Sequence, residues 1–223
     1  MGTIALAGGG EFAAPYEAID RDLLVASGGG DVLVLPTGAA YEHPDRAVEH
    51  ARAWFATLGA TVTGCRVLTR GDALVAGHAD QVRAARFVYL TGGSAMHLRS
   101  VLKRTPVWDA ILEVVASGGV VAGSSAGAMV LCDPLTDPRG GAFTLGLGLL
   151  EPMAVVSHAE EWPHDRLHRT LVLADAGMPL VCLDTGAAVV RDDDTGWRAY
   201  GKVTIYVDGK ETDDLGVLPL SSR

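Results

Sequence analysis

The chain has 223 residues, of which 48% are hydrophobic and 20% charged, an ordinary composition for a globular domain. Its formal net charge is −9 and no lysine or arginine cluster is present, which argues against a nucleic-acid-binding protein. The cysteines Cys65, Cys132 and Cys182 are far apart and form no C-x-x-C pair. We therefore expect neither a disulfide framework nor a zinc knuckle.

The sequence also bears on location and domain organisation. It contains no run of apolar residues long enough to cross a bilayer, and its N-terminus carries no recognisable export signal. We therefore expect a cytoplasmic protein without a membrane segment. The length suits one domain, and no linker or repeat interrupts the chain, so residues 1–223 are expected to form a single domain.

Short apolar runs that end in glycine recur through the first half of the chain. They are typical of strands buried on both faces, and they lie at residues 3–7, 31–35, 87–90 and 120–122. Helical patterns separate them, at residues 15–25, 44–58, 95–102 and 106–116. This alternation predicts an α/β fold with a mainly parallel sheet and helices on both faces.

The last quarter of the chain has a different pattern. Successive strands are expected at residues 178–183, 187–191, 197–201 and 202–207, followed by the hairpin turn Asp208-Gly209. We expect these strands to be antiparallel and to lie at one edge of the sheet. A strand at such an edge could pair with another chain and form a homo-oligomer.

The segment Gly123–Gly127 contains the pattern G-x-S-x-G directly after an apolar run and before a helical pattern. This strand–turn–helix setting is the one that a nucleophile elbow requires, because the sharp turn exposes the serine above the ends of the strands. The helix N-terminus adds N–H groups beside a developing oxyanion. We predict Ser125 as the nucleophile and treat Ser124 as the lesser candidate. The alternative is a turn that only packs tightly or holds an anion.

Two glycine-rich turns accompany the elbow. Gly92 and Gly93 follow the run 87–90, where a backbone N–H can point into the cleft. Gly93 and Ala126 are therefore predicted as oxyanion donors, with Gly92 and Ser94 next to the substrate; a plain strand-end turn is the alternative. Residues 8–10 lack the G-x-G-x-x-G spacing, so a tight turn near the cleft is preferred over a dinucleotide site.

A serine nucleophile needs a base and an acid that orients the base. Of seven histidines, His158 follows the apolar run 153–157 and should lie at a strand end, so it is predicted as the base. The acid stays open among Asp133, Asp137 and Asp184. A metal-ligand interpretation is disfavoured, because no HExxH is present and Pro163 interrupts a helix through the candidate ligands His158, Glu160, Glu161, His164 and His168.

These segments resemble the serine-peptidase family that contains dipeptidase E and cyanophycinase, whose members have a flavodoxin-like, class I glutamine-amidotransferase-like fold. The matching pieces are the segments 8–11, 91–93, 123–128 and 145–149 together with His158. The resemblance implies Ser125 as nucleophile, His158 as base, and oxyanion donors near Gly93 and Ala126. Amidotransferases of this fold carry cysteine at the elbow, so serine argues against glutaminase activity, and Cys132 lies too far along the chain to replace it.

The chain also departs from this family. Ser94 stands where members usually have Asp or Asn, and Thr185 stands roughly where cyanophycinases place a glutamate. Dipeptidase E uses an aspartate in the loop after the elbow, which favours Asp137 as the acid, with Asp184 as the alternative. Cyanophycin is therefore not the expected substrate.

The expected function is that of a serine hydrolase, most closely a peptidase E-like dipeptidase. It would cleave a short peptide or other small amide through an acyl-enzyme, without metal or organic cofactor. An esterase or non-peptide amidase using the same triad is one alternative. The other is a catalytically silent member that binds a small ligand in the cleft.

Overall fold

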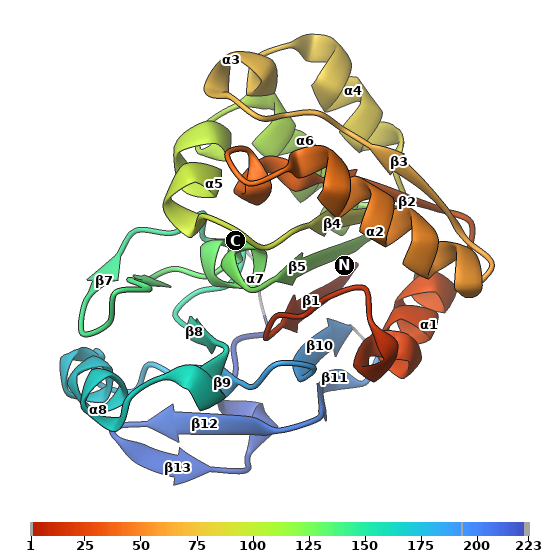
Figure 1. The fold of residues 1–223 in the computed structure, drawn as a ribbon. Coiled ribbons are helices and arrows are strands. Elements are labelled where there is room, and N and C mark those ends of the chain that lie inside the picture. Colours follow the sequence, from red (N-terminus) through yellow and green to blue (C-terminus); the bar gives the residue numbers. More distant parts are fainter. Residues whose placement is uncertain (1, 193, 221–223) are drawn as a thin grey trace.

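In the computed structural model, which describes residues 2–192 and 194–220, a seven-stranded sheet forms the centre of the protein with strand order β11-β10-β1-β5-β4-β2-β3 (Figure 1). Strands β1 to β5 pair in parallel, and β10 and β11 extend one edge in antiparallel orientation. The predicted mainly parallel sheet is confirmed. The strands are β1 (Thr3–Ala7), β2 (Asp31–Leu35), β3 (Thr61–Gly64), β4 (Phe87–Leu90), β5 (Val120–Ser124), β10 (Ala188–Asp192) and β11 (Gly196–Tyr200).

Helices cover both faces of this sheet because side chains alternate along each buried strand. In β1, Ala5 and Ala7 pack toward α1 and α2, whereas Ile4 and Leu6 pack into the core shared with the other helices. The first face carries α1 (Glu17–Ala26) and α2 (Pro44–Thr57). The second core includes residues of α3 (Arg70–Ala73), α4 (Ala76–Ala84), α5 (Ala95–Leu102), α6 (Pro106–Ala116) and α7 (Ala126–Leu131).

A second sheet, of order β13-β12-β9-β8, lies beside the first (Figure 1). It consists of β8 (Ala154–Ser157), β9 (Leu180–Leu183), β12 (Val203–Val207) and β13 (Lys210–Thr212). Val155 and Val181 on one of its faces join the core around α7. Val156 and Cys182 on the other face pack against α8 (His164–Leu173).

This second sheet corrects the prediction that the C-terminal strands share one edge of a single sheet. Only β10 and β11 extend the central sheet, whereas β9 pairs in parallel with β8 and in antiparallel orientation with β12. Strands buried on both faces carry no alternation that reveals their partner, so their apolar sequences could not distinguish these pairings.

Several short elements of the structure were not predicted from the sequence. They are β3, α3, α4, and the small hairpin formed by β6 (Leu135–Thr136) and β7 (Phe143–Thr144). In α4 the buried positions are the small residues Ala79 and Val82, so its apolar face is narrow and its helical pattern weak. The remaining short turns are 3-10 helices: η1 (Ala14–Tyr16), η2 (Pro36–Ala39), η3 (Ala159–Glu161) and η4 (Leu215–Val217).

The ends of strands from both sheets meet at one edge. The N–H of Ser125, after β5, donates to the carbonyl of Ala7 at 2.9 Å, and the N–H of His158, after β8, donates to the carbonyl of Gly8 at 2.9 Å. The turn after β1 therefore connects the end of the central sheet with the end of the second sheet. Among the described residues, no helix has the length and apolar character needed to cross a membrane.

Candidate active site

Ser125 occupies a sharp turn between β5 and α7. Its backbone has φ 49° and ψ −112°, a conformation that residues other than glycine rarely adopt. Glycines on either side permit the turn: a Cβ on Gly123 would lie 2.5 Å from the carbonyl of Gly127, and a Cβ on Gly127 would lie 2.3 Å from the carbonyl oxygen of Leu90. The backbone at Ser125 therefore makes the sharp strand-to-helix turn that a nucleophile elbow requires.

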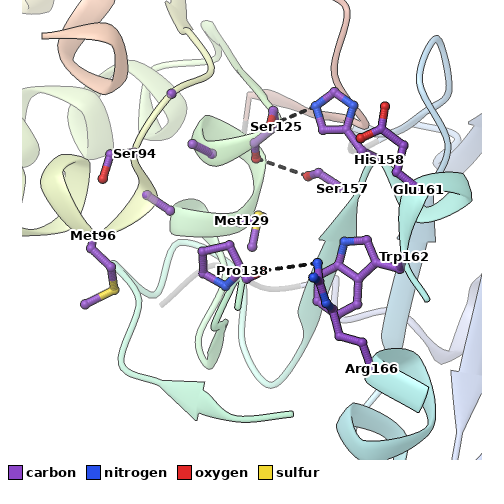
Figure 2. A pocket seen from close by; sticks show the side chains of 13 residues that line it. Ser94, Met96, Ser125, Met129, Pro138, Ser157, His158, Glu161, Trp162 and Arg166 are labelled. Atoms are coloured by element: carbon purple, nitrogen blue, oxygen red, sulfur yellow. Dashed lines mark hydrogen bonds between the residues drawn. The ribbon is translucent and has the colours of Figure 1, made fainter. Parts of the chain in front are cut away.

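His158 meets this serine from the second sheet. Its Nε2 atom lies 3.2 Å from Oγ of Ser125, within hydrogen-bond range (Figure 2). The imidazole rests on the turn after β1, because a Cβ added to Gly9 would lie 2.1 Å from its Cε1 atom. Ser157 adds a second link, since its hydroxyl donates to the carbonyl of Ser125 at 3.2 Å. The structure thus brings together the predicted nucleophile and the predicted base.

The other ring nitrogen of His158 contacts a threonine. Nδ1 lies 3.0 Å from Oγ1 of Thr185, which follows β9. The carboxylate of Glu160 in turn accepts the backbone N–H of Thr185, at 3.1 Å and 3.0 Å to its two oxygens. For Nε2 to accept the hydroxyl proton of Ser125, the imidazole must carry its own proton on Nδ1, the nitrogen that faces Oγ1 of Thr185.

The three aspartates considered as the acid lie elsewhere, and within the described ranges none of them hydrogen-bonds His158. Asp137 lies in the β6–β7 hairpin, where Arg139 donates to it at 3.0 Å and 2.8 Å from its side chain. These bonds lower the pKa of Asp137. Asp133 accepts the N–H of Gly146 at 3.0 Å, and Asp184 pairs with Lys202. The structure therefore places Thr185, and not Asp137, at Nδ1, because the hairpin turns Asp137 toward its own arginine.

The two predicted oxyanion donors line the same cavity as Ser125. Ala126 is the first residue of α7, so its N–H has no partner within the helix. Gly93 has φ 120°, and a Cβ there would lie 2.2 Å from the carbonyl oxygen of Gly38, so only glycine fits this turn. The N–H of Ser94 donates to that same carbonyl at 2.9 Å, which holds the turn close to η2.

Glu11 connects the turn at Gly92 and Gly93 with the turn at Ser124 and Ser125. Its part in the site was not predicted from the sequence. Its Oε1 accepts the N–H of Gly92 at 2.9 Å, and its Oε2 accepts the hydroxyl of Ser124 at 2.8 Å. One carboxylate thus links the turn at Gly92 and Gly93 to the turn at Ser125. Gly92 and Ser94 were both predicted to lie next to the substrate. The N–H of Gly92 is bonded to Glu11, whereas Ser94 lines the cavity and caps α5. An acidic residue directly after a glycine turn was the available sequence signal.

Replacing Glu11 by glutamine is expected to lower kcat about 10- to 100-fold. Glutamine can accept the N–H of Gly92 with its single oxygen, but its amide group must then donate to the hydroxyl of Ser124, so one charged acceptor is lost and the link between the Gly93 turn and the elbow is weakened. Displacing one oxyanion donor costs up to about 3 kcal/mol of transition-state stabilisation. Steady-state kinetics would measure the loss, with Glu17→Gln as control, because Glu17 pairs with Arg21 on the exposed surface of α1. An unchanged kcat in Glu11→Gln would contradict this anchoring role.

The cavity beside Ser125 has a volume of about 250 Å³, below the range typical of drug-sized ligands. Arg166 lines the wall of the cavity opposite the elbow (Figure 2). Its guanidinium lies 5.2 Å from the centre of the Trp162 ring and donates to the carbonyl of Pro138 at 3.4 Å. Met96 and Met129 add apolar surface. The cavity therefore suits a small group with both polar and apolar parts.

The residues considered as metal ligands separate into two groups. His158, Glu160 and Glu161 place ligand atoms within 4.8 Å of one another, while His164 and His168 stack on α8 with ring centres 6.3 Å apart. Both ring nitrogens of His158 already have side-chain partners, Ser125 and Thr185. A metal ion bound to His158 would therefore have to displace one of these two contacts.

Comparison with known proteins adds a family and a fold. The sequence model of peptidase family S51 matches residues 4–197. Uncharacterized peptidases of Listeria monocytogenes and Listeria innocua are 31% and 33% identical to the chain over 102 residues. These alignments cover 46% of this chain, and 48% and 47% of the two relatives, so the match spans about half of their length.

Two solved structures extend the similarity to nearly the whole chain. A peptidase from an acI-B1 actinobacterium superposes with a TM-score of 0.83 at 28% identity, covering 95% of this chain and 93% of that one. A putative peptidase E from Listeria monocytogenes superposes with a TM-score of 0.65 at 19% identity, covering 93% and 98%. The second likeness concerns the fold alone.

Proposed function

Because the chain belongs to peptidase family S51, we propose that it is a serine peptidase that cleaves a short peptide or another small amide. The observation that carries this proposal is the 3.2 Å contact between Nε2 of His158 and Oγ of Ser125. Ser125 has the strained backbone of an elbow and lies in a cavity beside free helix N–H groups.

In the first step, Oγ of Ser125 attacks the carbonyl carbon of the scissile amide while Nε2 of His158 takes the hydroxyl proton. The N–H groups of Gly93 and Ala126 donate to the oxyanion that forms. The imidazolium then protonates the amide nitrogen, the C–N bond breaks, and the amine leaves. The product of this half-reaction is an ester on Ser125.

In the second step, water replaces the departed amine. His158 takes a proton from the water as its oxygen attacks the ester carbonyl, and the same N–H groups stabilise the second oxyanion. The tetrahedral intermediate collapses, Oγ of Ser125 regains a proton from His158, and the acid product leaves. The mechanism requires no metal or organic cofactor.

A small substrate, such as a dipeptide, fits this site best. The 250 Å³ cavity leaves room for one compact side chain beside the elbow. Arg166 and Trp162 supply one charged and one aromatic surface there, and Met96 and Met129 supply apolar contacts. Dipeptidase activity of the peptidase E kind is therefore the specific form of the proposal, with a cytoplasmic location.

A fluorophosphonate should label the pure protein at Ser125. The reagent reports an activated serine without knowledge of the substrate, because Oγ displaces fluoride from phosphorus while His158 takes the proton. Mass spectrometry of the digested adduct would locate the label. His158→Ala is expected to slow labelling by a factor on the order of 10² to 10⁴, the usual contribution of a general base.

The outcomes separate the proposed function from its alternatives. Labelling at Ser125 that depends on His158, followed by turnover of dipeptides in a substrate panel, would support the peptidase. Turnover of esters without any turnover of dipeptides would favour an esterase on the same residues, because a serine peptidase also cleaves esters. No labelling, under conditions that label a control serine hydrolase, would contradict the proposal and favour a protein that only binds a small ligand.

A further inference from the structure

The group at Nδ1 of His158 is a neutral hydroxyl. In Ser-His-Asp sites a carboxylate at this position orients the imidazole and stabilises the imidazolium that forms during catalysis. Thr185 lies 3.0 Å from Nδ1 and can orient the ring, but it carries no charge. If the site is a serine peptidase, a negative charge is missing from the position where it is normally found.

Glu160 places a carboxylate directly behind this threonine. Both of its oxygens accept the N–H of Thr185, at 3.1 Å and 3.0 Å, and one of them lies within 4.8 Å of a ring nitrogen of His158. Desolvation acts to raise the pKa of Glu160, but hydrogen bonds from the side chain and the backbone of Thr185, together with the charge of His158, bring the pKa below its ordinary value. Glu160 is therefore ionised at neutral pH and oriented toward Thr185.

The backbone explains how a residue two positions after His158 reaches this place. His158 adopts a left-handed conformation, with φ 49° and ψ 46°, and the N–H of Glu161 donates to its carbonyl at 2.9 Å. The chain thus reverses through η3. Thr185 is confined from the other side, since a Cβ on Gly10 would lie 2.7 Å from its Cγ2 atom.

We propose that Glu160 is the acid of this site and that it acts on His158 through the hydroxyl of Thr185. The order of contacts is Ser125, His158, Thr185, Glu160: Nδ1–H donates to Oγ1, and the threonine O–H donates to the carboxylate. No proton leaves the threonine or reaches the glutamate. Glu160 is a positioning residue that holds Thr185 and supplies negative charge to the imidazolium. This inference rests on the proposed function.

The surroundings of Glu160 limit how strongly its charge can raise the reactivity of Ser125. Glu160 is exposed, so water screens its charge, and its contribution should fall well below the ~10⁴-fold effect of a buried triad aspartate. Lys202 lies close enough to interact with Glu160 and forms an ion pair with Asp184 at 2.9 Å. Among the described residues, Glu161 on η3 and Arg166 on α8 line the same cavity as His158, and Glu11, in the turn after β1, bonds to Ser124 next to the nucleophile.

The test is the rate of fluorophosphonate labelling of Ser125 as a function of pH, in the wild type and in Glu160→Gln. Glutamine retains a carbonyl oxygen to accept the N–H of Thr185 but removes the charge. We expect the plateau rate to fall about tenfold and the acidic limb of the pH profile to move to lower pH, because the imidazolium loses a neighbouring anion. Asp165→Asn, which removes an exposed carboxylate from α8, should leave the profile unchanged.

A second pair of variants tests the path through the hydroxyl. Thr185→Val removes the hydroxyl with little change in shape, and it should slow labelling about as much as Glu160→Gln does. The double variant Glu160→Gln/Thr185→Val should be no slower than either single variant, whereas independent roles would multiply the two losses. Thr185→Ser retains the hydroxyl and should recover most of the rate.

Each outcome bears on one proposal only. A Glu160→Gln profile that matches the wild type, in a protein still labelled at Ser125, would overturn the role of Glu160 and leave the peptidase proposal intact. A purely structural role would also leave the acidic limb in place, because glutamine preserves the contact to Thr185. Failure of the wild type to react at Ser125 would instead overturn the proposed function.

Discussion

Ser125→Ala is expected to lower kcat by about a millionfold, the loss seen when the nucleophile of a comparable site is removed. Alanine has no oxygen to form the acyl-enzyme, and the 3.2 Å contact with His158 disappears. It keeps the Cβ atom, so the backbone strain at φ 49° is unchanged. Thermal unfolding should therefore stay close to that of the wild type. Dipeptide hydrolysis measured on the purified variant checks the first expectation, and calorimetry checks the second.

Ser124→Ala is the matched control for this prediction. Ser124 is buried and its hydroxyl donates to Glu11 at 2.8 Å, whereas the contact to His158 comes from Ser125. Its replacement should cost about 1–3 kcal/mol of stability, because one oxygen of Glu11 loses its partner, while the nucleophile remains. Full activity in Ser125→Ala together with loss in Ser124→Ala would mean that the neighbouring serine performs the chemistry.

Gly9→Ala is expected to have the second largest effect, a fall in kcat/KM on the order of 10³-fold. An added Cβ would lie 2.1 Å and 2.2 Å from Cε1 and Nε2 of His158, so the imidazole must leave its position beside Ser125. Gly9 also has φ +122°, where side chains are strained. Correct placement of a general base contributes about 10²–10⁴-fold, and the strain should lower stability by about 1–3 kcal/mol. Steady-state kinetics and chemical denaturation measure the two losses.

Gly77→Ala provides a control with the same chemical change. Gly77 lies in α4, and a Cβ there would meet no atom within 4 Å. Alanine should therefore raise helix stability by up to about 1 kcal/mol and leave kcat/KM unaltered. A kcat/KM in Gly9→Ala equal to that of the wild type would contradict this prediction. It would mean that catalysis does not require the imidazole of His158 at its present position beside Ser125.

Much of the fold could be predicted from the sequence because its determinants are local. Runs such as 87–90 and 120–122 are apolar, short and followed by glycine, and the intervening helices have apolar residues at helical spacing. The partners of the later strands could not be predicted in this way. β9 and β10 are similar apolar runs in neighbouring parts of the chain, yet β9 pairs with β8 and β10 pairs with β1.

The same division applies to the site. The elbow is a local feature, since Gly123, Ser125 and Gly127 follow a strand and precede a helix, and His158 directly follows an apolar run. The aspartate expected as the acid was chosen because the resemblance to dipeptidase E implies an acid in the loop after the elbow. Asp137 lies in a hairpin that returns its carboxylate to Arg139, and only the pairing of β8 with β9 brings Thr185 to His158.

The sequence by itself thus determined the individual strands and helices of the first half of the chain, the strand–turn–helix segment around Ser125 and the place of His158 at a strand end, because each depends on residues close together in the chain. The tertiary structure alone decided the partners that complete the site. Glu11 reaches Gly92 and Ser124, and Thr185 reaches His158, across 81, 113 and 27 positions of the chain. Such contacts depend on which strands are neighbours in each sheet, and strands that are apolar on both faces do not encode their neighbours in a local pattern.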